Sequence, residues 1–457
     1  MNQAEPHIPF LASGSYPERS GNMVRPLVDG MPAFRRICEA IETARHSVWT
    51  TVTFANPDFQ MPDGRGSFLD VLDGAVARGL DVRVIFWRHN PETAHYGQTI
   101  SGSPEDHAML RGRASRFRAR WDRAHGTFCQ HQKSWLIDAG QPSEIAFVGG
   151  INLTPGNLAL PGHAGEGQRH DAYVEVAGPS ATDVHHNFVQ RWNEASERTE
   201  EDGVWGHDGD DDLRFPTRLS APQGGSLVQI QRNVHPGRYS DGWATPGGQT
   251  YEIAGGERTI FEQYKQAIDA ARRTIYIENQ AIPVPEIAVK LNEALRRGVE
   301  VVVLVPAEPE DHVRAARRNP ARQDLFDQIE ALAGFETFAL VGIARENAHG
   351  GRSNIYVHGK IMLVDDAWAT IGSCNLHSHS LFGNSEMNAS FWDPAVVRAL
   401  RAQLLAEHLG QDTASLDDRE AFRLYRRIAR ENRLKGDAGD FRWQGLAFAL
   451  DSTAYGK

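Results

Sequence analysis

Hydrophobic and polar positions follow the same succession of patterns in the two halves of the chain. Residues 31–44 and 259–271 place apolar side chains at the three- and four-residue spacing of an amphipathic helix. Each segment leads into a stretch rich in β-branched and aromatic residues, at 47–54 and 274–279. The pattern therefore predicts a helix followed by a buried strand, and predicts it twice.

The elements that come next recur in the same way. A second helical pattern ends near Gly79 in the first half and near Gly298 in the second, where glycine is well suited to close a helix. A strand follows at 81–86 and at 299–305, and two further strand-like runs come after it in each half. This succession predicts an α/β unit with a mixed, mostly buried sheet.

Direct similarity between the halves supports an internal duplication. IETARHSVWT at 41–50 matches IDAARRTIYI at 268–277 at an offset of 227 positions, and AVARGLDVRVIFW at 75–87 matches ALRRGVEVVVLVP at 294–306 at an offset of 219. A small drift in offset is what loops of different length produce between matching elements. We predict two similar α/β units, each with a mixed β-sheet flanked by helices, and an active site at their pseudo-twofold interface.

Composition divides the chain further. Residues 201–225 are rich in Asp, Gly and Pro, as expected for a solvated linker. The predicted organisation is an N-terminal extension at 1–22, a first half at 23–200, the acidic linker at 201–225, a second half at 226–410 and a charged helical tail at 411–457.

The overall composition is that of an ordinary globular protein, and it excludes some functions. The 457 residues include 40 % hydrophobic and 23 % charged residues, and the formal net charge is −11. That charge argues against a protein whose main task is to hold nucleic acid. The three cysteines, at 38, 129 and 374, are too few and too scattered for a disulfide framework or a zinc site.

Targeting signals are not evident in the sequence. No apolar run approaches the roughly 20 residues of a membrane-spanning helix. The first residues show neither the basic region nor the apolar core of a signal peptide. We therefore expect a cytoplasmic protein, with export by a signal-independent route left open.

One short pattern occurs once in each half, namely His, one residue, Lys, four residues and Asp. It reads HQKSWLID at 131–138 and HGKIMLVD at 358–365, again 227 positions apart. The repeated positions are His131, Lys133 and Asp138 in the first stretch and His358, Lys360 and Asp365 in the second. Because side chains alternate along a strand, the His and Lys of each stretch share a face, whereas the Asp faces away or lies beyond the strand.

Two imidazole–ammonium pairs that meet across one cleft suit attack on a phosphodiester. One imidazole attacks phosphorus, the other protonates the leaving oxygen, and the lysines hold the remaining phosphate oxygens. Histidine fits both roles because its pKa lies near neutrality. This chemistry needs no metal or other cofactor, and the sequence shows no convincing metal-binding cluster. A single His-x-Lys is common in strands, so the hypothesis depends on the repetition.

The chain resembles the phospholipase D superfamily, whose signature is this pattern occurring twice. The stretches that extend the resemblance are GGIN at 149–152, RHDAYVEVAGP at 169–179, IYIENQ at 275–280, IYVHGKIMLVDDAWATIGSCN at 355–375 and EHLG at 407–410. The similarity covers most of residues 23–410, and these stretches are closest in sequence to the lipid-cleaving phospholipases D.

The resemblance implies a covalent phosphohistidine intermediate. By family precedent we expect His131 to be the nucleophile and His358 to be the general acid, and later the base that activates water or an alcohol. The residues expected to bind phosphate oxygens are Lys133, Lys360, Asn152 and Asn375.

The resemblance also assigns the acidic residues. Asp171 and Glu386 match the family's partners that orient the catalytic imidazoles, although the sequence leaves open which acid serves which histidine. Asp138 and Asp365 are expected to support the fold rather than to carry protons. His170, next to Asp171, is expected to be hydrogen-bonded and structural.

Three functions remain open at this point. The first is a phospholipase D that hydrolyses the headgroup phosphodiester of a glycerophospholipid and can transfer the phosphatidyl group to an alcohol. The second is a phosphatidyltransferase of the cardiolipin synthase kind; such enzymes commonly carry a membrane-embedding N-terminal segment, which this sequence does not show, so hydrolysis is expected first.

The third function is that of a nuclease. RGRASRFRARWDR at 111–123 holds six arginines with Phe117 and Trp121 between them, and a positive groove with aromatic side chains binds single strands. A solvated helix face or a clamp for an anionic headgroup explains the stretch equally well. The expected partners are a phospholipid, met transiently at a membrane surface, and a water or alcohol acceptor. Headgroup preference and oligomeric state stay open.

Overall fold

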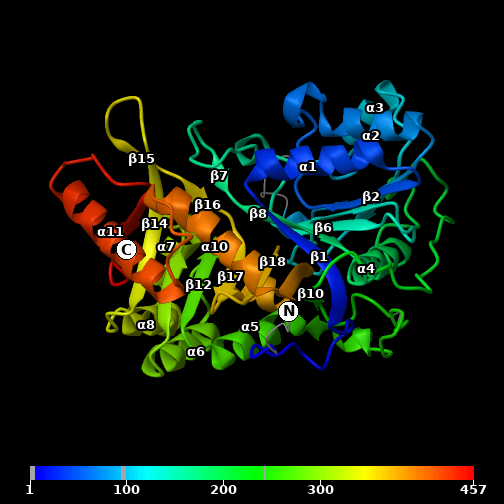
Figure 1. Ribbon diagram of the computed structural model, residues 1–457. Coiled ribbons are helices and arrows are strands. Elements are labelled where there is room, and N and C mark those ends of the chain that lie inside the picture. The colour runs from blue at the N-terminus through cyan, green and yellow to red at the C-terminus, as the bar shows by residue number, and fades with distance from the viewer. Residues whose placement is uncertain (1–5, 94–98, 241) are drawn as a thin grey trace.

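The computed structural model describes residues 6–93, 99–240 and 242–457. It has a mixed α/β fold in which the sheets of the two halves lie between outer layers of helices (Figure 1). In pairing order, the first sheet contains β1 (Arg19–Val28), β8 (Ala172–Ala177), β6 (Ile145–Gly149), β5 (Ser134–Ile137), β2 (Ser47–Val52), β3 (Asp81–Trp87), β4 (Arg118–Asp122) and β9 (Val204–Trp205).

The second sheet repeats this order. Its strands are β10 (Ser226–Val234), β19 (Glu386–Trp392), β18 (Trp368–Gly372), β17 (Lys360–Val364), β12 (Thr274–Asn279), β13 (Glu300–Leu304), β14 (Phe338–Glu346) and β20 (Ala447–Ala449). Each sheet has two parallel pairs, formed by β2, β3 and β4 in the first sheet and by β12, β13 and β14 in the second. The other pairings within these two orders are antiparallel. This matching order is what a duplicated chain would give, and the duplication itself stays a prediction.

Shorter strands join the two halves and border the second sheet. β1 pairs with β10 antiparallel and so links the sheets, while β7 (Arg169–His170) pairs parallel with β16 (Tyr356–Val357) across the halves. β11 (Glu257–Arg258) pairs with β10, and β15 (Arg352–Asn354) pairs with β14.

The helices cover the outer faces of the sheets. They are α1 (Gly30–Thr43), α2 (Phe68–Ala77), α3 (Pro104–Gly112), α4 (Ala181–Asn193), α5 (Thr259–Ala270), α6 (Pro285–Arg296), α7 (Asp311–Arg317), α8 (Gln323–Leu332), α9 (Ser378–Phe382), α10 (Pro394–Leu409) and α11 (Asp418–Asp437). In Figure 1, α1, α2 and α3 lie above the first sheet, and α5, α6 and α8 lie below the second. The helices and strands predicted at the start of each half are confirmed as α1, β2, α5 and β12.

The three large apolar clusters of the described residues follow these layers. One apolar cluster lies between the first sheet and its helices, and another lies between the second sheet and its helices. The third cluster contains Val148 and Val174 of the first sheet together with Ile361 and Ile371 of the second. The two sheets therefore pack against each other through apolar faces, and this packing holds the ends of β5 and β17 in a fixed relation.

Local sequence explains where key elements begin and end. α10 starts after Asp393, whose side chain accepts hydrogen bonds from Ala395 N and Val396 N at 3.1 Å, and Pro394 occupies its first position. The helix ends at Gly410, which adopts the left-handed conformation at φ 60°. In Figure 1, α10 crosses the middle of the view beside β1. Its last turn also contacts the first half, because Glu407 Oε1 accepts a hydrogen bond from Gly162 N at 2.8 Å.

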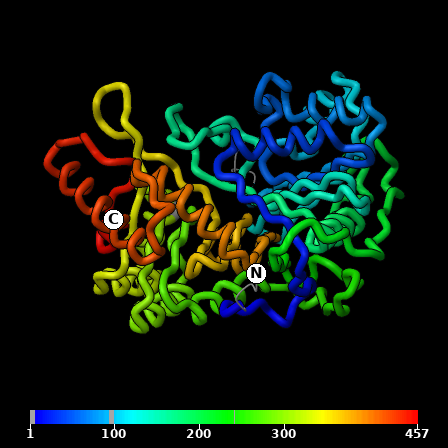
Figure 2. Tube along the Cα trace, viewed as in Figure 1, coloured from blue at the N-terminus to red at the C-terminus, as the bar shows by residue number. Residues whose placement is uncertain are grey.

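The segments predicted to flank the halves contribute to the fold. Part of the acidic linker forms β9 at the edge of the first sheet, and the helical tail continues beyond α11 into β20 at the edge of the second. Ile8 and Phe10 of the N-terminal extension are buried in the second core, beside α5 (Figure 2). Residues 1–5 lie outside the described residues. Among the residues that the structure describes, no helix has both the length and the apolar character needed to cross a membrane.

Candidate active site

The two repeated stretches occupy equivalent places in the two sheets. His131 and Lys133 come directly before β5, while His358 comes before β17 and Lys360 begins it. All four residues are buried, and His131, at 8 %, is the most exposed of them. Contacts across the halves bring the two pairs to one site. Burial holds the pKa of His358 well below the usual range, and the nearby charges of Lys360 and Lys133 act in the same direction.

Matching backbone hydrogen bonds fix the two histidines. His131 N donates to Ser385 O at 2.8 Å, and His358 N donates to His170 O at 2.7 Å. In each case the acceptor lies in the other half of the chain, one residue before a candidate acid. Each histidine is therefore aligned with the segment that carries an acidic side chain of the opposite half.

The side chains complete this crossed arrangement. His131 Nδ1 lies 2.8 Å from Glu386 Oε2, and His358 Nδ1 lies 2.5 Å from Asp171 Oδ2. Thus the acid of the second half orients the histidine of the first, and the reverse holds for the other pair. Because Nδ1 of each ring is engaged, Nε2 is the nitrogen left to meet a substrate.

The two acids differ in their electrostatic setting. Burial raises the pKa of Asp171 to about 6, although Lys360 acts to lower it. Burial also acts to raise the pKa of Glu386, but the neighbouring His131 and Lys133 outweigh it, and the pKa is lowered on balance. Glu386 is thus the more firmly ionised of the two carboxylates. For His131, burial has the opposite effect and lowers the pKa, and the negative charge of Glu386 partly offsets it.

Both lysines are buried, and burial changes their protonation. Burial lowers the pKa of Lys133 to about 7 and that of Lys360 to about 8. Lys133 Nζ donates to His131 O at 2.7 Å and to Thr53 Oγ1 at 3.2 Å, and Lys360 Nζ donates to His358 O. A bound phosphate would favour the charged form of both lysines.

The two asparagines predicted to bind phosphate oxygens are in the interior of the protein. Asn152 and Asn375 are buried, and the Oδ1 atom of each is without a hydrogen-bond partner. Gly150, two residues before Asn152, lies where a Cβ atom would come within 2.4 Å of Asp171 Oδ1 and 3.0 Å of Lys360 Cδ. Glycine is therefore needed here because Asp171 of the same half and Lys360 of the other half leave no room for a side chain.

Asp138 and Asp365 lie elsewhere, at the far ends of β5 and β17. Asp138 Oδ1 accepts hydrogen bonds from Arg45 N, His46 N and Ser47 N at 2.7–3.2 Å. Asp365 accepts hydrogen bonds in the same way from the backbone of residues 272–274, at 2.8–2.9 Å. Their contacts agree with the expected supporting role, because each carboxylate holds the turn from a helix into the neighbouring strand.

The structure adds residues that the sequence interpretation did not single out. Ser373 Oγ donates to Glu386 Oε2 at 2.6 Å, and so this hydroxyl supports the carboxylate that orients His131. Gln280 Oε1 lies 3.4 Å from Lys360 Nζ. Both residues fall in stretches that carry the family resemblance, which was the available signal.

The arginine-rich stretch has a structural role that its sequence did not reveal. Phe117 and Trp121 are completely buried, so neither can stack on a nucleic-acid base. Arg118 pairs with Asp211 at 2.9 Å, and Arg120 pairs with Asp212 at 2.9 Å. Two aspartates of the acidic linker are therefore anchored to the first sheet, and the stretch lends no support to the nuclease hypothesis.

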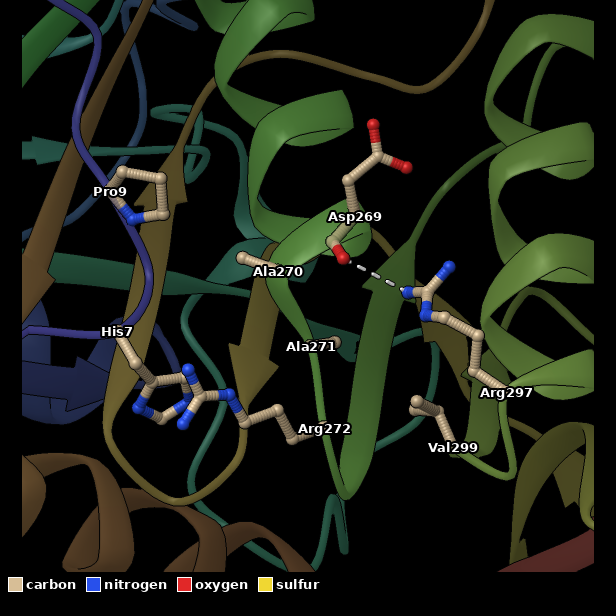
Figure 3. Close-up of a pocket in the computed structure, with 8 residues that line it drawn as sticks. All are labelled: His7, Pro9, Asp269, Ala270, Ala271, Arg272, Arg297 and Val299. Carbon is tan, nitrogen blue, oxygen red and sulfur yellow. Dashed lines mark hydrogen bonds between the residues drawn. The ribbon is translucent and has the colours of Figure 1, made fainter.

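A surface cavity of about 560 Å³ lies away from the two histidines. It is lined by His7, Asp269, Arg272 and Arg297 among others, beside the C-terminal end of α5 (Figure 3). His7 Nε2 lies 2.8 Å from Asp365 Oδ2, at the end of β17 opposite His358. This cavity is therefore not part of the site formed by the repeated stretches.

Comparison with known families agrees with this geometry. A family model described as "Cardiolipin synthase, PLD-like domain" matches residues 264–407, which include the second repeated stretch. These findings support the phospholipase D superfamily for this chain. Cardiolipin synthase A from Pseudomonas putida is 24 % identical to the chain over 427 residues, which cover 91 % of this chain and 75 % of the relative.

Two further similarities differ in extent. Phospholipase D A from Dictyostelium discoideum is 24 % identical over 468 residues, and the match covers 82 % of this chain but only 33 % of that relative. The chain thus spans about a third of the length of that protein. The crystal structure of phosphatidylserine synthase from Haemophilus influenzae Rd KW20 matches with a TM-score of 0.55 at 14 % identity, covering 92 % of this chain and 95 % of that one. This match supports the fold.

Proposed function

We propose that this phospholipase D superfamily member transfers the phosphatidyl group of a glycerophospholipid to an alcohol through a covalent intermediate on His131. The crossed pairs of His131 with Glu386 and of His358 with Asp171 carry the proposal, because they place two oriented imidazoles beside two buried ammonium groups. The match to the cardiolipin synthase family model and to Pseudomonas cardiolipin synthases supports a phospholipid as the substrate.

Transfer to an alcohol replaces hydrolysis as the first choice. The sequence led us to expect hydrolysis because the residues around the second repeated stretch resemble those of lipid-cleaving phospholipases D, and because no membrane-embedding segment was evident. Neither observation bears on which acceptor attacks. The family model and several relatives carry the name cardiolipin synthase, and they favour transfer. Hydrolysis remains the second candidate, supported by the similarity to phospholipase D A.

The first step of the proposed reaction forms a phosphohistidine. Neutral His131 Nε2 attacks phosphorus, a P–N bond forms, and the P–O bond to the headgroup breaks. Protonated His358 gives its proton to the leaving headgroup oxygen. Burial and the neighbouring cations lower the pKa of His358, and the negative charge of a bound phosphodiester would favour its protonated form.

The second step reverses the roles. His358, now neutral, takes the proton of the acceptor hydroxyl, whose oxygen attacks phosphorus while the P–N bond breaks. Lys133, Lys360, Asn152 and Asn375 would hold the non-reacting phosphate oxygens. Glu386 stabilises the positive charge on His131 that accompanies attack and departure, because its carboxylate lies 2.8 Å from Nδ1.

A product assay on phosphatidylglycerol vesicles tests this function. Transfer from one phosphatidylglycerol to another yields cardiolipin and glycerol, whereas hydrolysis yields phosphatidic acid and glycerol. We expect cardiolipin to be the main product, and added ethanol to divert the phosphatidyl group to phosphatidylethanol. Phosphatidic acid as the main product without ethanol would favour the hydrolytic alternative.

Two variants separate the proposed chemistry from a contaminating activity. His131→Asn should lose turnover of every lipid, while His185→Asn should retain it, because His185 pairs with Glu144 at 2.9 Å and lies in none of these contacts. Lipid left intact by the wild-type protein, or equal turnover by His131→Asn, would refute the proposal. Cleavage of single-stranded DNA with intact lipid would restore the nuclease reading.

A further inference from the structure

A second group of ionisable side chains lies buried behind His358. We name Asp29, His163, His170 and Glu407 the buried cluster, since their ligand-type atoms all lie within 4.8 Å of one another. Asp29 precedes α1, His163 lies in the segment before β7, His170 ends β7, and Glu407 lies in the last turn of α10. The cluster therefore joins three segments of the first half to one helix of the second.

The separations within the buried cluster match a metal coordination sphere. His163 Nε2 lies 3.2 Å from His170 Nδ1, 3.2 Å from Glu407 Oε1 and 3.5 Å from Asp29 Oδ2. His170 Nδ1 lies 3.0 Å from Asp29 Oδ1. Two ligand atoms of a tetrahedral zinc ion with bonds of about 2.0 Å lie about 3.3 Å apart. Four nitrogen and oxygen donors thus converge at nearly the spacing that zinc requires.

Unpartnered atoms point to a missing ligand for these side chains. Asp29 and His163 are completely buried, and Asp29 Oδ2 and Glu407 Oε2 have no hydrogen-bond partner. Buried polar atoms are normally satisfied, and an orphaned carboxylate oxygen is costly. Asp29 also occupies the N-cap position of α1 without capping it, because its side chain turns toward the two histidines instead.

The buried carboxylates of this region also need a positive charge beside them. Asp29, Glu278 and Glu407 place three carboxylates beside one another in the interior. In the part of the chain that the structure describes, each of the three pairs with a histidine ring, and none pairs with a lysine or arginine. Buried carboxylates require compensation by a cation or a metal ion.

Histidine 170 has the surroundings of a metal ligand. Its Nδ1 atom faces the buried cluster, while Nε2 lies 3.0 Å from Glu278 Oε2. Glu278 in turn accepts a hydrogen bond from Tyr276 OH at 2.7 Å. A carboxylate that accepts a hydrogen bond from the second nitrogen of a histidine is the usual support of a metal-bound imidazole.

We propose that Asp29, His163, His170 and Glu407 bind a divalent transition metal, with zinc as the ion best matched to two imidazoles and two carboxylates. The ion holds the first half to α10 of the second. It also fixes His170, whose carbonyl oxygen accepts the hydrogen bond from His358 N and whose neighbour Asp171 orients the His358 ring. The site is thus a structural support behind one catalytic histidine, and it takes no part in the chemistry.

Metal content tests this proposal independently of activity. The full chain is purified without a metal-affinity tag, and its bound metals are measured by elemental mass spectrometry. We expect about one zinc ion per chain, or uptake of about one zinc ion when chelator-treated protein is dialysed against zinc chloride and desalted. Chelation should lower the melting temperature, and zinc should restore it.

Two variants locate the ion, and two further variants serve as controls. His163→Asn should lose the zinc. Glu407→Gln should weaken zinc binding, and its amide oxygen can still accept the hydrogen bond from Gly162 N. Glu407→Gln therefore tests the site even if His163→Asn does not fold. His185→Asn is the matched control, because His185 is a buried histidine paired with a carboxylate outside the buried cluster. His131→Asn should keep the zinc, which separates this site from adventitious binding at the catalytic histidines.

Several results would overturn the proposal. Wild-type protein that holds no metal and takes up none would leave the buried cluster as a hydrogen-bonded network of charged histidines. Zinc that stays in His163→Asn and leaves in His131→Asn would place the ion at the catalytic histidines. A different transition metal, bound in wild type and lost in His163→Asn, would support the site and refute the choice of zinc.

Discussion

The replacement of Glu386 by glutamine tests the crossed arrangement most directly. The carboxylate is completely buried, and Oε2 lies 2.8 Å from His131 Nδ1 and accepts a hydrogen bond from Ser373 Oγ at 2.6 Å. Glutamine keeps the size of the side chain and removes its charge. The variant therefore isolates the electrostatic support of His131 from its packing.

The expected loss follows from the distance between the two groups. When facing atoms lie 2.8 Å apart, the delocalised charges of a carboxylate and an imidazolium are centred about 4 Å apart, and at an effective dielectric constant of about 20 they attract by about 4 kcal/mol. If that attraction is felt in the transition state and not by the neutral ring, its loss lowers kcat by about a thousandfold.

The pH dependence gives a second readout with a definite sign. Glu386 stabilises the imidazolium form and so raises the pKa of His131 against the effect of burial. In Glu386→Gln that pKa falls, and the neutral, nucleophilic ring persists to lower pH. The acid limb of kcat/KM, measured on phosphatidylglycerol vesicles over a pH series, should therefore move to lower pH.

A matched variant guards against a loss caused by unfolding alone. Glu144→Gln also removes a buried carboxylate that lies 2.9 Å from a histidine, His185, and it should change kcat by less than about tenfold. A kcat of Glu386→Gln within about tenfold of wild type, or an acid limb that stays in place or moves to higher pH, would refute the reasoning.

Three further predictions concern other parts of the site. The value of kcat/KM should fall as pH rises through about 7 to 8, because Lys133 and Lys360 lose the protons that hold the phosphate. In a pH series, Lys133→Met should weaken this dependence. An unchanged profile in the variant would contradict the role of Lys133. Trapping with a phosphorus-labelled lipid, followed by peptide mapping, should leave label on His131, whereas label on His358 would reverse the two roles. Asp365→Ala should lower the free energy of unfolding, measured in urea, by about 2–4 kcal/mol, because three backbone N–H groups lose their acceptor. Turnover per folded molecule should stay near that of wild type. A loss of turnover without a loss of stability would assign Asp365 to the chemistry.

Much of the fold was predictable because the relevant patterns are local. The strand β12 matches the predicted range 274–279, and its residues are buried throughout, as a run of β-branched and aromatic residues indicates. The last two strands of the sheets were harder to foresee. β9 and β20 are short, and both lie in segments expected to be linker or tail. Their pairing depends on a neighbouring strand edge that local sequence does not describe.

The candidate site shows the same division. Repetition of a short pattern singled out both histidines and both lysines without knowledge of the fold, and the family resemblance singled out the two acids. It could not assign Glu386 to His131, because the contact joins residues that are 255 positions apart. The role of the arginine-rich stretch stayed open for a related reason, because composition does not tell whether Trp121 is buried or exposed.

The sequence by itself determined the α/β class, the repeated order of elements and the identity of the paired His and Lys residues. These follow from the alternation of side chains along strands and from motif spacing, which are set by neighbours in the chain. Only the tertiary structure decided that each histidine is oriented from the opposite half, and that Asp29, His163, His170 and Glu407 converge behind His358. Both outcomes depend on how the two sheets pack face to face, and that packing places side chains together regardless of their distance along the sequence.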